Sequence, residues 1–100
     1  MSWRRLAIGL LILGGVSCGP VKSTAVILDA EGACRQAEVE HAGEVKEASY
    51  YYHSATQYLE KAKEEQGYAD YDAAIDFGTR AKELAEKARS IAAAKPRKTP

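Results

Sequence analysis

The hydrophobic and polar positions divide the chain into an unbroken apolar run near the N-terminus and a periodic pattern in the remainder. Residues 6–16 are aliphatic or glycine throughout, after a start that contains two arginines. From residue 23 to residue 94 the apolar positions recur every three or four residues, as one face of an α-helix requires. The pattern predicts an all-α domain behind a separate N-terminal segment.

Two apolar stripes predict an antiparallel helical hairpin. Between the stripes lies Gly67, which suits the C′ position after a helix, and Asp70, which suits the N-cap of the next helix. Helices joined by so short a link pack antiparallel. Facing positions have numbers that sum to 136, so that Leu59 lies opposite Phe77, although a register displaced by one layer is also packable. The two stripes are Val45, Ala48, Tyr52, Ala55, Leu59 and Ala62, and Ala74, Phe77, Ala81, Leu84, Ala88 and Ile91.

A third stripe upstream predicts an additional N-terminal helix and therefore a small three-helix bundle. Its phase breaks near Gly43, which favours one helix over Thr24–Ala42 and another that begins at Tyr50 with Ser49 as its N-cap. The alternative is one long helix over Thr24–Gln66. In either case residues 24–94 form the helical domain. The third stripe consists of Ile27, Ala30, Cys34, Ala37 and His41.

The N-terminal segment has the form of a lipoprotein signal peptide. A basic start, an apolar run and small residues lead up to Cys18. The run is shorter than the about 20 apolar residues that a membrane-spanning helix needs. We therefore expect residues 1–17 to be removed, Cys18 to become the lipid-bearing N-terminus, with a palmitate among its acyl chains, and residues 18–23 to form a linker. The alternative is an ordinary signal peptide cleaved near Ser17 or Gly19.

Similarity to bacterial lipoproteins carries this expectation further. The family pattern has Leu where Gly15 stands, whereas Val16, Ser17 and Cys18 fit it. Gly19, rather than Asp, after the cysteine implies sorting to the outer membrane, where the domain would face the periplasm. Export through the twin-arginine route is a further alternative, although the flanks of the arginine pair match that signal poorly.

The charge argues against a nucleic-acid-binding protein, and the cysteine content argues against a domain stabilised by internal disulfides. Without residues 1–17, 12 basic residues remain against 14 acidic ones, which is no electrostatic footprint for nucleic acid. Once Cys18 carries a lipid, Cys34 is the remaining cysteine, so no intramolecular disulfide supports the domain. Cys34 is then either a small buried side chain or a link between two chains. The last six residues, 95–100, form a basic tail that we expect to be disordered.

The stretch around the predicted turn resembles a known family. Residues 55–77 contain Tyr-Leu-Glu-Lys-Ala-Lys-Glu-Glu, Gly-Tyr-Ala-Asp-Tyr and Ala-Ile-Asp-Phe, and Ala-Lys-Glu-Leu-Ala follows from Ala81. Over roughly residues 42–92 the chain is similar to the domain of unknown function 4398 family of small bacterial envelope lipoproteins. The resemblance implies secretion, lipidation and association with OmpA-like envelope proteins, and it brings no catalytic residues. A weaker likeness to one tetratricopeptide helix rests on Tyr71, Ala74 and Ala81, with Gly78 in place of a large residue.

Few residues are candidates for chemistry. His41 and His53 have no metal-binding or nucleophile spacing; with Glu38 and Glu44, His41 would offer at most a weak cation site on a continuous helix. Tyrosine is enriched in protein interfaces, and three consecutive tyrosines cannot all face one core. Tyr50 and Tyr51 are therefore the candidate partner-binding residues, with packing between helices as the alternative.

These observations lead to one expected function and two alternatives. We expect a membrane-anchored envelope lipoprotein with a scaffold or protein-interaction role, no catalysis, and no metal, cofactor or small-molecule substrate beyond the lipid on Cys18. One alternative is a structural spacer whose helix surface and tail 95–100 contact peptidoglycan. The other is a repeat-like adaptor that binds peptides.

Overall fold

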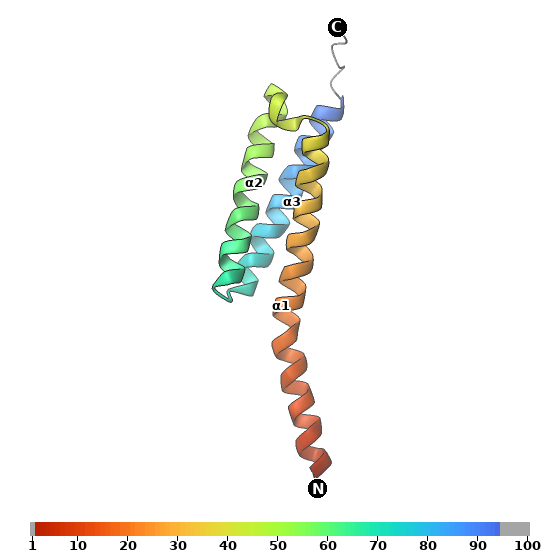
Figure 1. Cartoon of the computed structure of the whole chain (residues 1–100), viewed down its shortest axis with the longest axis vertical. Coiled ribbons are helices and arrows are strands. Elements are labelled where there is room, and N and C mark those ends of the chain that lie inside the picture. The colour runs from red at the N-terminus through yellow and green to blue at the C-terminus, as the bar shows by residue number, and fades with distance from the viewer. Residues whose placement is uncertain (1, 95–100) are drawn as a thin grey trace.

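The computed structural model is a three-helix bundle, as the sequence predicts (Figure 1). It describes residues 2–94, with side chains from residue 18 onward. The helices are α1 (Ser2–Val39), α2 (Lys46–Gly67) and α3 (Tyr71–Ala94), and a short 3-10 helix, η1 (Ala42–Glu44), connects the first two. The described residues contain no strand. The expected disordered tail 95–100 lies outside them.

α3 contacts both of the other helices, and α1 and α2 also contact each other directly. α2 and α3 form the antiparallel hairpin, and α1 packs on this hairpin mainly through α3. The N-terminal half of α1 extends past the α2–α3 turn, as the red and orange part of the ribbon shows (Figure 1). The molecule is consequently elongated, with principal extents of 76 × 20 × 14 Å.

Contacts across the hairpin fit the predicted 136 register. The rings of Tyr58 and Phe77 stack with their centroids 6.0 Å apart, and their positions sum to 135. The Lys87 ammonium lies 4.4 Å from the centroid of the Tyr51 ring, and those positions sum to 138. Each member of the two hairpin stripes is buried or half-buried.

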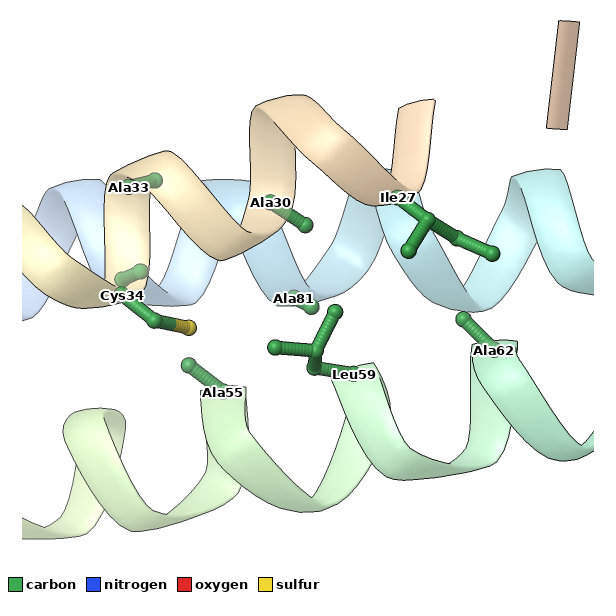
Figure 2. Close-up of a cluster of buried hydrophobic side chains, with 9 residues drawn as sticks. Ile27, Ala30, Ala33, Cys34, Ala55, Leu59, Ala62 and Ala81 are labelled. Atoms are coloured by element: carbon green, nitrogen blue, oxygen red, sulfur yellow. The ribbon is translucent and has the colours of Figure 1, made fainter. Parts of the chain in front are cut away.

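The core is built almost entirely from alanine. Of the 15 buried hydrophobic residues in the described part, 12 are alanines, and the others are Ile27, Cys34 and Leu59. Figure 2 shows Ile27 and Cys34 of α1 directed toward Leu59 and its neighbouring alanines on α2. Because the separation of packed helices depends on the side chains at the contact, alanine layers bring the backbones close.

α3 buries a second seam of small residues that the sequence stripes did not predict. Besides the stripe that faces α2, it buries Gly78, Ala85 and Ala92. A Cβ atom added at Gly78 would lie 2.7 Å from Cγ1 of Val26 on α1, closer than carbon atoms approach one another. The glycine that departs from the tetratricopeptide pattern is thus a point where α1 and α3 leave no room for a side chain.

The break between the first two helices is present, but its ends differ from those predicted. α1 ends at Val39 rather than Ala42, because His41 adopts a left-handed conformation with φ 58°. α2 begins at Lys46 rather than Tyr50, because the Val45 carbonyl already accepts a helical bond from the Ser49 N–H at 2.8 Å. Ser49 is therefore inside α2, and the single-long-helix alternative is wrong. His41, the last member of the third stripe, is exposed.

Gly43 has a steric role in this connection. A Cβ atom at Gly43 would lie 3.2 Å from Cδ2 of the Tyr52 ring. Small size at position 43 lets the connection pass close over Tyr52.

The α2–α3 turn places its left-handed residue later than predicted. Gly67 is still helical, and the positive φ of 62° falls on Ala69. The turn is closed by the Asp70 N–H, which donates to the Glu65 carbonyl at 2.9 Å. The expected capping role of Asp70 is confirmed, since its Oδ1 accepts a hydrogen bond from the Ala73 N–H at 3.2 Å.

Leu59 is the largest residue classed as buried on α2, so its truncation tests the core directly. We expect Leu59→Ala to lower the free energy of unfolding by about 2–5 kcal/mol, as at other buried leucines. Glu60→Ala, at the exposed neighbouring position, should change it by no more than about 0.5 kcal/mol. Chemical denaturation measures both values, and equal effects would contradict the assigned helix face.

Candidate functional site

Cys18, the predicted lipid attachment site, is exposed on α1 next to the α2–α3 turn. Its neighbour Gly19 lies against the first residue of α3: a Cβ atom at Gly19 would be 3.0 Å from Cδ2 of Tyr71. The segment around the predicted cleavage site is thus packed against the turn end of the bundle.

Residues 18–23 are helical rather than the linker we expected, and polar contacts hold them in place. Gln66 Nε2, near the end of α2, donates to Ser23 Oγ at 2.9 Å and to Thr24 Oγ1 at 3.0 Å. The Ser23 hydroxyl, in a fully buried residue, donates to the Pro20 carbonyl at 3.1 Å. We call these contacts of Ser23, Thr24 and Gln66 the polar clamp. They fix α1 to the hairpin within two turns of Cys18, which a mobile linker would not allow.

The two candidate tyrosines differ in how far they are buried. Tyr51 is half-buried, packs against core residues near the start of α2 and lies under the Lys87 ammonium. Tyr50 is 72% exposed. The rings of Tyr50 and Tyr51 meet edge to face, with their centroids 5.4 Å apart. Tyr51 is therefore tied to helix packing, whereas Tyr50 offers its ring to solvent.

Tyr50 lies at one end of an open groove between α2 and α3 that the sequence did not predict. Two adjoining hollows between these helices share Tyr58, and the larger has a volume of about 670 Å³. A third hollow beside Tyr58 is lined by residues of α2 alone. The Arg80 guanidinium lies 5.6 Å from the centroid of the Tyr58 ring, whose other neighbour is Phe77. We define the tyrosine groove by six lining residues: Tyr50, Ser54, Tyr58, Phe77, Arg80 and Glu83.

The groove combines aromatic and charged side chains. Its rings supply flat apolar area and its guanidinium and carboxylate supply polar contacts, the combination found in protein interfaces. The sequence signal was the 136 register, which places Tyr58 near position 78 of α3, but ring stacking depends on side-chain directions that spacing alone does not give.

The histidine cluster considered as a weak cation site is not formed. His41 Nδ1 lies 3.2 Å from a Glu44 carboxylate oxygen, and both side chains are largely exposed. The left-handed backbone at His41 ends the helix face that Glu38, His41 and Glu44 would have shared. Within residues 18–94 no group of three potential ligands is close enough to hold a metal ion.

Cys34 is buried between α1 and α2, which agrees with the interpretation of this residue as a small buried side chain. Burial raises the pKa of its thiol, and the nearby Glu31 carboxylate also raises it, whereas Lys63 lowers it. Lys63 and Glu31 are themselves an ion pair across the two helices, with 3.2 Å between Nζ and Oε1.

Comparisons with known proteins add no relative. No protein-family model, curated protein or solved structure matches the chain. Within the described residues, no helix combines the length and apolar character needed to cross a bilayer. The resemblance to envelope lipoproteins therefore stays a prediction.

Burial of the Cys34 thiol predicts a loss of stability in alkaline solution. The native fold disfavours the thiolate, so the unfolded chain loses its thiol proton at lower pH than the native chain. The contribution of Cys34 is thus complete below the ordinary pKa of 9.0 and declines as the pH rises through the native value. Unfolding free energies at about pH 7 and about pH 10 measure this decline.

Cys34→Ala is the matched control for this measurement. Tyr52, whose pKa burial also raises, and other groups titrate in the same range. Subtracting the pH dependence of Cys34→Ala gives the effect of the thiol together with its coulombic influence on the pKa of Tyr52. Identical pH dependence in the two proteins would contradict the prediction.

Proposed function

We propose that this chain is an exported, non-enzymatic lipoprotein of the bacterial envelope, in which Cys18 carries the lipid and the bundle binds an envelope protein. The observation that carries the proposal is the position of Cys18. It follows the apolar run after one serine, is exposed, and lies within two helical turns of the polar clamp at one end of the bundle. A lipid at this position leaves the Tyr50 end of the tyrosine groove clear of the anchor.

Pro20 supports removal of residues 1–17. It lies inside α1, where a proline removes a backbone hydrogen bond and costs about 3 kcal/mol. If the chain is cut before Cys18, Pro20 is the third residue of the mature protein. In the first turn of a helix a proline forfeits no hydrogen bond, because the N–H groups there have no helical partner. The mature helix is therefore better suited to this sequence than the precursor helix.

The tyrosine groove supports a non-enzymatic binding role. Charged groups in it are exposed, and one of them, Arg80, is placed over an aromatic ring rather than beside a reactive group. The resemblance to envelope lipoproteins suggests a partner of the OmpA-like class. Outer-membrane sorting, suggested by Gly19, would place the domain in the periplasm with that partner.

The spacer alternative is favoured by a different observation, that Cys18 and the end of α3 lie at opposite ends of the bundle. Gly19, next to Cys18, lies against Tyr71 at the α2–α3 turn, whereas α3 ends beside η1 (Figure 1). A tail that follows Ala94 would start far from the lipid. Contact of residues 95–100 with peptidoglycan would then span the distance from membrane to wall.

Lipidation is tested by metabolic labelling with a palmitate analogue. We expect label on the wild-type protein, none on Cys18→Ser, and accumulation of the precursor when the lipoprotein signal peptidase is inhibited. Continued labelling of Cys18→Ser, or normal maturation under the inhibitor, would rule out the anchor.

Partner binding is tested with two purified baits, an OmpA-like protein and peptidoglycan. Tyr50→Ala should reduce capture by the protein bait, because it removes an exposed ring at the end of the groove. Leu28→Ala is the control, since Leu28 is also exposed, at 58%, but lies on α1. Equal binding by the two variants would contradict the groove as the binding surface. Capture by peptidoglycan that is lost only on deletion of residues 95–100 would favour the spacer.

A further inference from the structure

The turn end of the bundle gathers exposed apolar groups around Cys18. Tyr68, in the α2–α3 turn, is 73% exposed, and Val21, one helical turn from Cys18, is 66% exposed. Tyr71 lies against Gly19. We define the anchor tip as Cys18, Val21, Tyr68 and Tyr71. These residues come from two parts of the chain, the first described turns of α1 and the α2–α3 turn, which contact each other through Gly19 and Tyr71.

The position of the anchor tip relative to Cys18 is fixed by packing. Gly19 has no room for a side chain without displacing Tyr71, so α1 and the start of α3 are in direct contact. The polar clamp joins α1 to the last turn of α2 through Gln66. A membrane that holds Cys18 therefore holds both helices of the hairpin at their turn, rather than a domain on a flexible tether.

We propose that the anchor tip inserts Tyr68 and Val21 into the headgroup region of the bilayer and so fixes the orientation of the bundle on the membrane. This inference rests on the proposed lipid anchor. Tyrosine favours the membrane–water interface because its ring is apolar and its hydroxyl is polar. Acyl chains on Cys18 enter the bilayer beside these residues. Tyr68 and Val21 are then already at the membrane surface and need to move only a short distance to enter the headgroup region.

The charges around the tip indicate which lipids it accepts. Lys22 follows Val21 on α1, and the carboxylates of Asp70 and Asp72 flank Tyr71 at the start of α3. On the last turns of α2, Lys61 pairs with two further carboxylates, at 3.7 and 3.3 Å. Without an excess of cations, attraction to anionic lipids contributes little. The occupant is therefore a zwitterionic headgroup layer bound through apolar and aromatic contact, and the insertion should be insensitive to salt.

Orientation on the membrane follows from the insertion. Tyr50 and Gly67, the last residue of α2, are 17 residues apart. A helix rises about 1.5 Å per residue, so the turn that contains Tyr68 begins roughly 26 Å from Tyr50 along α2. With the tip at the headgroups, the Tyr50 end of the groove is held away from the bilayer. This arrangement presents the groove to a partner in the aqueous phase.

The test uses two single-tryptophan forms of the lipidated full chain in vesicles of phosphatidylcholine. Tyr68→Trp reports on the tip, and Tyr50→Trp, with the nearly equal exposure of 72%, is the matched control. Both carry Trp3→Phe, which removes the one natural tryptophan whether or not residues 1–17 are cleaved. We expect Tyr68→Trp to show blue-shifted emission and quenching by brominated lipids, and Tyr50→Trp to be quenched by aqueous acrylamide instead.

Each outcome decides a different point. Equal accessibility of the two variants to acrylamide, in protein that floats with the vesicles and carries the lipid, overturns the insertion and leaves the anchor standing. A protein without lipid on Cys18 by mass spectrometry overturns the anchor and this inference together. Insertion of the Tyr68→Trp indole that disappears in high salt overturns the argument that apolar contact drives it.

Discussion

Close approach of three helices along seams of alanine is the constraint on which the rest of the structure depends. Alanine buries little area, so each layer contributes less than the about 1.5–3 kcal/mol of a fully buried large side chain. It compensates through high helix propensity and through dispersion contacts between closely spaced backbones. Where a larger side chain lies in a seam, the residue that faces it must be small, as Gly78 is opposite Val26.

The same constraint explains where the aromatic residues lie. Where the helices run close together, large rings fit at the borders of the seams, so Tyr58 and Phe77 stack at the edge of the hairpin rather than inside it. Arg80 covers one of these rings, and Lys87 covers Tyr51 in the same way. The groove is thus a consequence of how an alanine core excludes large side chains.

The sequence was sufficient to predict the three helices, the antiparallel hairpin and the cap at Asp70, because each depends on local spacing. It was insufficient at the helix ends, since the left-handed residues are His41 and Ala69 rather than the nearby glycines. At both places the chain follows the packing of the helices that it joins. Backbone strain of this kind, about 1–2 kcal/mol for a residue with a Cβ atom, leaves no mark on the pattern of apolar positions.

In the candidate site, too, some features could be predicted from local sequence and others could not. Cys18 and Tyr50 could be proposed from neighbouring residues, as a cysteine after an apolar run and as one ring of a tyrosine triplet. The groove and the polar clamp could not, because they join residues of different helices through side-chain directions. Ser23 illustrates the point: its sequence position falls in the predicted linker, yet it is the largest fully buried side chain of the described part.

That burial links the core to the position of Cys18. A hydroxyl placed inside an alanine seam must be hydrogen-bonded, and Ser23 meets this need with Pro20 on its own helix and Gln66 on α2. The bond to Gln66 specifies how far α1 slides along the hairpin, which apolar alanine layers alone do not. A polar contact therefore sets the place of Cys18 relative to the turn. Because the apolar core is rigid, the place of Cys18 relative to the tyrosine groove is fixed as well.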